Sequence, residues 1–293
     1  MDYINAFIEG YSGYAGYLWQ EITFGYNYKP WYQNYFYWLI LVSLLSFGLE
    51  LLKPWRKEQP KFRKDFWLDT FYMFFNFFLF SLIIYNAASN VVVNFFNNGI
   101  IAVTGFDLQA SNPMNDFPYW AILLIGFLVR DFVQWWVHRL LHRVPKLWEF
   151  HKVHHSVKQM GFAAHLRYHW METIVYRSIE YLPLALLGIG LHDFFIIHIF
   201  TLMIGHLNHS NIKFPLGPLK YIFNNPQMHI WHHAKYIPED RSNGVNFGIS
   251  LSIWDYIWKT DYIPYDGRDI ELGFPDDEHF PKDFVHQATH GLK

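Results

Sequence analysis

The feature that most constrains the fold is a run from Thr70 to Phe106 that contains no Asp, Glu, Lys or Arg. About 20 apolar residues in a helix cross the hydrocarbon layer of a bilayer, so this run is typical of membrane helices. Charged residues make up 16% of the chain, against about 25% in soluble domains. The pattern predicts an all-α, multi-pass membrane helical bundle of four to five spanning or re-entrant helices. We expect these helices near residues 33–52, 68–88, 118–137, 174–191 and 193–208.

The basic residues predict the orientation of these helices. Six Lys and Arg residues lie between Lys53 and Lys64, and such loops remain in the cytoplasm. Counting helices onward places 138–167 and 213–293 on the same side. We therefore expect a multi-pass integral membrane protein whose histidine-rich segments form a cytoplasmic cap. The predicted organisation is N-terminal membrane helices over 1–117, a second domain over 118–262, and a polar, peripheral tail over 263–293.

Cysteine and net charge exclude several classes of protein. The chain has no Cys, which removes disulfides, Cys-ligated zinc and any Fe–S cluster within the chain. A formal net charge of −2 argues against a nucleic-acid partner.

Three histidine boxes carry the chemical signal. His138 and His142 form an HxxxH pattern, and two HxxHH patterns follow at 151–155 and 229–233. Residues three and four apart share a helix face, so we expect each box to present two or three imidazoles in one direction. Imidazole suits iron, zinc and copper, and eight such groups exceed the needs of one tetrahedral ion. The boxes therefore predict two metal ions, the alternative being a His-rich interfacial surface without metal.

Further histidines extend the predicted ligand set. His206 and His209 end the last apolar helix, where an ionisable residue is costly and usually functional. His169 shares a helix face with His165 and is the better candidate of the two, as a ligand or as support for one. The predicted metal ligands are His138, His142, His151, His154, His155, His169, His206, His209, His229, His232 and His233.

Few carboxylates accompany these histidines. Asp131 and Glu172 are candidate acceptors for imidazole N–H groups, or plain helix-packing residues. The chain has no HExxH, which removes the common zinc-protease pattern. We expect the other histidines to pack at helix ends or to be solvated: His192, His198, His279, His286 and His290.

The boxes and their spacing resemble the integral-membrane fatty acid hydroxylase/sterol desaturase superfamily. The matching elements are HRLLH, HKVHH, an apolar hairpin and MHIWHH. Segments 131–138, 208–212, 216–219 and 246–255 are also similar to family segments. The resemblance covers roughly 118–260 and leans toward the alkylglycerol-monooxygenase-like or bacterial branch.

The resemblance implies an oxidoreductase with a non-haem di-iron centre that activates O2 at the cytoplasmic membrane face. It implies hydroxylation, monooxygenation or desaturation of a fatty acyl, alkyl-ether or sterol-type lipid, with no catalytic residue beyond the metal ligands. The residues agree, since many imidazoles and few carboxylates suit a redox metal rather than Mg²⁺ or Ca²⁺. Zinc is expected as a substitute on overexpression. The fused members' cytochrome-type domain is absent, so we expect a separate electron donor: a reductase with ferredoxin or cytochrome b5, or a pterin.

A metal-handling membrane protein, either a transporter or a sensor, is the alternative function. Transporters usually place their ligands near the bilayer midplane on broken helices. The boxes here lie at helix ends and in the polar region 139–158, which favours an enzyme.

Overall fold

The computed structural model describes residues 3–23, 32, 34–76, 86–107, 110, 113–114 and 116–292. Across these ranges the chain is helical and contains no β-strand, only three isolated bridges. An all-α fold is therefore confirmed. The α-helices are α1 (Tyr3–Thr23), α2 (Tyr35–Leu52), α3 (Phe66–Phe74), α4 (Asn86–Thr104), α6 (Tyr119–Arg143), α7 (Pro145–His155), α8 (Trp170–Leu186), α9 (Leu191–His209), α10 (Pro226–His232), α11 (Ile253–Trp258) and α12 (Phe284–Thr289).

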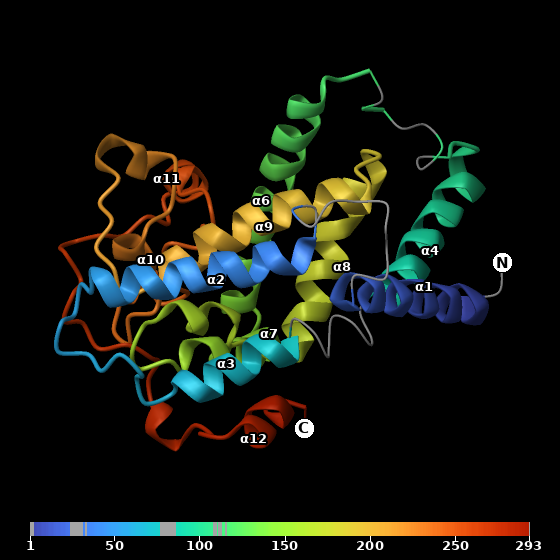
Figure 1. Ribbon diagram of the computed structural model, residues 1–293. Coiled ribbons are helices and arrows are strands. Elements are labelled where there is room, and N and C mark those ends of the chain that lie inside the picture. Colours follow the sequence, from blue (N-terminus) through green and yellow to red (C-terminus); the bar gives the residue numbers. More distant parts are fainter. Residues whose placement is uncertain are drawn as a thin grey trace.

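Two parts of the molecule are distinguished in Figure 1. Helices α1 and α4 pack together at one end, opposite α10 and α11. Between these ends, α9 packs against both α2 and α6, and α6 also packs against α8. The three histidine boxes lie on α6, α7 and α10, so they gather away from the α1 and α4 pair.

A proline separates the first two boxes. Helix α6 ends at Arg143, and Val144 in an extended conformation leads directly into Pro145 at the start of α7. Proline disfavours a helical residue before it and is well suited to the first turn of a helix. The chain therefore turns between His138 and His151, and their Nε2 atoms lie 3.2 Å apart.

Helices α2 and α6 are the two described helices that are long and apolar enough to span a membrane. Only 28% of the apolar window of α2 and 39% of that of α6 are buried. Leu44 and Leu52 of α2 and Trp120 of α6 are largely exposed. A core helix of a soluble protein would bury these side chains, whereas a lipid-facing helix exposes them.

Two of the predicted membrane spans coincide with these helices, and the others do not. Helices α2 and α6 coincide with the spans expected at 33–52 and 118–137. The span expected at 68–88 includes 77–85, which lie outside the described residues. Helices α8 and α9 replace the spans expected at 174–191 and 193–208, and neither is among the described helices that meet the length and hydropathy criteria.

The C-terminal segment is not peripheral, and our expectation for it was wrong. Phe274 and Phe280 are buried against Tyr72 and Val153. The Tyr72 hydroxyl donates a hydrogen bond of 3.0 Å to Oε1 of Gln287. Aromatic residues spaced along a polar segment therefore anchor it to α3 and α7. The division of the chain at 117 and 262 stays a prediction.

Candidate metal centre

Nine histidines form two adjacent groups. In each, every side chain offers one ring nitrogen, and these nitrogens lie within 4.8 Å of one another. All nine side chains are buried except that of His142, which is half-buried. The first histidine group is His138, His142, His151, His155 and His232, and the second histidine group is His154, His209, His229 and His233.

Each HxxHH box is divided between the two groups. Helix α7 supplies His151 and His155 to the first group, but His154 to the second. Helix α10 and its C-cap residue do the reverse. His232 belongs to the first group, and His229 and His233 belong to the second. Two imidazoles of each box thus share a direction, and the third imidazole of each HxxHH box faces the other group. Residues i and i+4 point together, while residue i+3 lies far enough round the helix to face the neighbouring group.

Hydrogen bonds to the far side of the ring fix the tautomer in the first group. Nδ1 of His138 lies 2.8 Å from the Phe247 carbonyl oxygen, and Nδ1 of His232 lies 2.7 Å from that of Val245. Nδ1 of His151 lies 2.7 Å from Oε2 of Glu172. Because a carbonyl oxygen only accepts, Nδ1 of His138 and His232 carries the proton, and Nε2 of the neutral ring is left with a free lone pair.

The same arrangement recurs in the second group. The Nδ1–H of His154 donates to the Arg167 carbonyl at 3.0 Å, and that of His209 donates to the Gly205 carbonyl at 2.8 Å. Their Nε2 atoms are therefore also unprotonated. Histidines that bind metals in proteins characteristically donate their other ring N–H in this way.

Ring nitrogens face one another within each group. The unprotonated Nε2 atoms of His154 and His209 are 3.2 Å apart, and Nε2 of His138 lies 3.2 Å from Nε2 of His151. The lone pairs of His154 and His209 form no hydrogen bond with each other, and a cation between them removes their repulsion. Two imidazole nitrogens bound to one ion at about 2.1 Å lie about 3.0–3.4 Å apart. The spacing therefore fits shared metal ions.

Burial favours the metal-binding form of these rings. It lowers the pKa of His154 to about 4 and holds the pKa values of His155 and His233 well below the usual range. These imidazoles are therefore neutral at pH 7, the form that binds metal. All the ligands within the two groups are imidazoles, which suit iron, copper or zinc better than Mg²⁺ or Ca²⁺.

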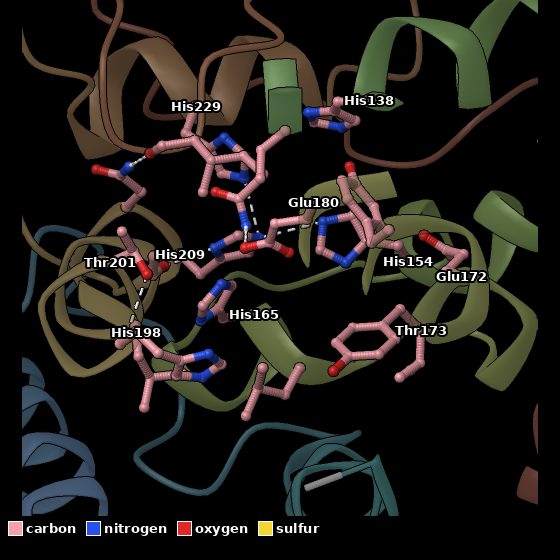
Figure 2. Close-up of a pocket in the computed structure, with 18 of the residues that line it drawn as sticks. His138, His154, His165, Glu172, Thr173, Glu180, His198, Thr201, His209 and His229 are labelled. Atoms are coloured by element: carbon pink, nitrogen blue, oxygen red, sulfur yellow. Dashed lines mark hydrogen bonds between the residues drawn. The ribbon is translucent and has the colours of Figure 1, made fainter. Parts of the chain in front are cut away.

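A cavity opens beside both groups. Its volume is about 130 Å³, an order of magnitude above the space that one water needs. His138 and His151 of the first group line it, as do His154, His209 and His229 of the second. In Figure 2, His138 and His229 lie above the cavity, and His198 and Thr173 lie below it.

Comparison with known proteins agrees with this geometry. Residues 123–260 match the model of the fatty acid hydroxylase family, and this range contains all nine histidines. Over this range the chain is similar to the fatty acid hydroxylase family. No solved structure matches it.

Several curated relatives are lipid-modifying enzymes by name. Ornithine lipid hydroxylase of Rhizobium tropici is 34% identical over 52% of this chain and 45% of its own length. Human alkylglycerol monooxygenase is 34% identical over 46% of this chain and 29% of its own length. Methylsterol monooxygenase 1-1 of Arabidopsis thaliana is 29% identical over 47% of this chain and 46% of its own length. The match thus spans less than half the length of each relative.

A loop after α10 orients ligands of the first group. Asp255 accepts hydrogen bonds from the backbone N–H groups of Phe247 at 2.9 Å and Gly248 at 2.7 Å. That contact holds the Val245 and Phe247 carbonyls against His232 and His138. Sequence reasoning missed Asp255 as a positioning residue, because the groups that act on the histidines are backbone carbonyls.

The two predicted acidic acceptors differ in their contacts. Glu172 contacts His151, as expected, and its Oε1 accepts a hydrogen bond from the His169 backbone N–H at 3.2 Å. Asp131 instead accepts from the Ser250 N–H at 3.0 Å and from Nε1 of Trp254 at 2.9 Å. It therefore ties α6 to the segment that leads into α11 rather than to an imidazole.

Two predicted ligands lie outside both groups. His169 caps α8, and its Nδ1 accepts a hydrogen bond from the Met171 N–H at 3.1 Å. His206 lies with its Nδ1 3.1 Å from the Phe162 carbonyl and its Nε2 3.2 Å from Oγ of Ser43. Both side chains are buried.

The remaining histidines lie either at the surface or against the cavity. His286 is exposed and pairs with Asp283, as expected of a solvated residue. His290 is partly buried beside Glu149. His165 and His198 line the cavity, which the sequence did not indicate for either residue.

Proposed function

We propose that this protein is an O2-dependent membrane lipid hydroxylase or monooxygenase, or a desaturase, that holds two iron ions in the two histidine groups. The observation that carries the proposal is the pairing of buried Nε2 atoms at 2.9–3.2 Å within each group, where the lone pairs of His154 and His209 face each other. The names of the relatives, which include lipid hydroxylases and monooxygenases, support the lipid substrate. We place His169 and His206 outside the ligand set.

The residues of the chain divide the work as follows. The nine imidazoles hold the ions, while Glu172 and the Val245 and Phe247 carbonyls orient the rings. When bound, iron supplies the redox chemistry that O2-dependent oxidation of a C–H bond requires. The cavity beside the groups admits the apolar part of a fatty acyl, alkyl-ether or sterol-type lipid.

We propose that the exposed apolar sides of α2 and α6 contact lipid and that the histidine groups face the cytoplasm. The apolar exposure of these helices and the basic loop 53–64 support this placement. Reporter tags after residues 57 and 159 and at the C-terminus should report one compartment. A tag near Asn97 should report the opposite one. Tags after 159 and at the C-terminus on different sides would contradict this topology.

We also propose that electrons come from a separate donor, such as a reductase with ferredoxin or cytochrome b5, or a pterin. The chain has no Cys and therefore no ligand set for an Fe–S cluster. Sustained turnover requires reducing equivalents beyond those that two ions store. Iron-loaded protein with lipid and O2 alone should therefore stop before multiple turnovers.

The test uses purified full-length protein loaded with iron or with zinc. Iron-loaded protein should hold about two ions per chain and consume O2 when lipid and a reductase system are present. Zinc-loaded protein should be inert because zinc has no redox chemistry. Turnover by the zinc form, or without a reductant, would overturn the oxygenase proposal. Metal flux into proteoliposomes without lipid oxidation would instead support the metal-handling alternative.

A further inference from the structure

A strip of polar side chains leads from the first histidine group into the apolar part of α6. Arg130, Gln134 and His138 are each four residues apart, so they share one helix face. Each step of four residues advances about 6 Å along a helix. All three side chains line the cavity, and all three are buried. The cavity therefore carries hydrogen-bonding groups on the side away from the metal ligands.

The neighbouring helices complete this polar wall. Arg130 forms a buried ion pair with Glu180 of α8 and donates to the Thr201 hydroxyl of α9. Nε2 of Gln134 donates to Oε1 of Glu180 at 3.3 Å. Because Glu180 compensates the charge of Arg130, this ion pair adds no net positive charge that would attract a carboxylate or a phosphate.

Two polar side-chain oxygens in this wall have no hydrogen-bond partner among the described residues. They are Oε1 of Gln134 and Oγ1 of Thr173, and the two side chains are 8% and 2% exposed. A buried polar atom without a partner is costly, and its persistence calls for an explanation. Since Nε2 of Gln134 is already engaged with Glu180, the atom left over is an acceptor, and its missing partner is a donor.

We infer that the cavity recognises a neutral hydrogen-bond donor of the lipid, an amide N–H or a hydroxyl, through Oε1 of Gln134. The inference rests on the proposed function for its lipid substrate. Thr173, on α8 two turns from Glu180, supplies a further hydrogen-bonding group along the same wall. A lipid that offers only acceptors at this point, such as a simple ester, leaves Oε1 of Gln134 unpaired and binds more weakly.

The experiment compares matched probes on the full-length protein in detergent, in metal-free and iron-loaded form. N-methylhexadecanamide and methyl hexadecanoate differ at one position, N–H against O. Hexadecanol and its methyl ether form the second pair. Dissociation constants are measured by competition against a radiolabelled probe of the same chain length. Wild type should bind the donor-bearing member of at least one pair about fivefold more tightly, the effect of one neutral hydrogen bond.

Variants assign this preference to a residue. Gln134→Leu should abolish the preference by weakening only the donor-bearing probe, and Gln134→Met serves if the leucine variant fails to fold. Gln159→Leu is the matched control, because its Oε1 is also buried and unpartnered among the described residues, but it does not line the cavity. The control should keep the wild-type preference. Thr173→Val should reduce the preference, while Thr70→Val on α3 should leave it unchanged.

The outcomes separate this inference from the proposed function. A preference within the amide pair identifies an amide, and one within the alcohol pair identifies a hydroxyl; either supports the inference. Equal binding within both pairs, or a preference that survives both Gln134 variants, overturns it. Binding to metal-free protein needs no turnover. Donor preference without lipid-dependent O2 consumption therefore counts against the proposed function alone, and oxidation without donor preference counts against this inference alone.

Discussion

The first and second histidine groups are built from the same boxes but are not equivalent. The first has five imidazoles, of which His138 and His151 line the cavity. The second has four, of which His154, His209 and His229 line it. Metal sites with fewer protein ligands and an open side are typical of catalysis, whereas closed sites are typical of structure. We propose that substrate meets the second group, because more of its imidazoles line the cavity.

The largest loss of metal and turnover is expected from the histidine of each HxxHH box that binds apart from its two neighbours in the box. His154→Ala removes the ligand that α7 gives to the second group, and His232→Ala removes the one that α10 gives to the first. Each variant should lose bound metal and more than about 100-fold of turnover, since a lost ligand costs more than a lost supporting residue. Metal content and lipid oxidation measure this. The variant His286→Ala, at an exposed position, should behave as wild type. Wild-type metal content in the His154 or His232 variant would show that its box is not part of the metal centre.

A second pair of variants tests whether the groups differ in function. His155→Ala affects only the first group and His233→Ala only the second. Each should leave about one tightly bound ion per chain, and His233→Ala should cost more turnover because the second group lines more of the cavity. Titration with a chelator and turnover under saturating lipid provide the measurements. Identical losses in both variants would remove the functional distinction.

A substitution at Asp255 tests how the loop supports the ligands of the first group without changing any ligand. Asp255→Ala frees the loop whose carbonyls orient His138 and His232, so the metal affinity of the first group should fall about 10–100-fold. The second group should keep its ion. Asp277→Ala, in the C-terminal segment, is the control for a lost buried carboxylate. Equal loss from both groups would show that the loop supports the whole centre rather than one side of it.

The smallest effect is expected from Glu172→Gln. Burial raises the pKa of Glu172 to about 8, so the carboxyl is largely neutral at pH 7 and little charge is lost. The amide oxygen of the variant can still accept from Nδ1–H of His151. Metal affinity of the first group should therefore fall by less than about tenfold, below the range for complete removal of a supporting group. Glu172→Ala should lower it further. A glutamine variant as impaired as the alanine variant would assign the effect to the α8 cap, which Glu172 also completes.

Local patterns predicted much of this molecule. The histidine boxes, α2 and α6 follow from residue spacing and hydropathy, which act over a few neighbouring residues. The division of each box between two groups depends on how α7 and α10 approach each other, and no local pattern records that. The carbonyls of Val245 and Phe247 carry no side-chain signal at all. The spacing of Arg130, Gln134 and His138 is visible in the sequence, but spacing alone does not show that the three side chains line a cavity.

The division of each HxxHH box between both groups has a thermodynamic consequence. One short helix, α7 or α10, cannot be ordered for one group and remain disordered for the other. Loading the first ion therefore removes part of the conformational freedom that the second would otherwise have to restrict. Metal uptake should be positively cooperative, and the coupling must be reciprocal between the two positions. At limiting metal, the population should then consist mainly of empty and doubly loaded chains, with few that carry a single ion.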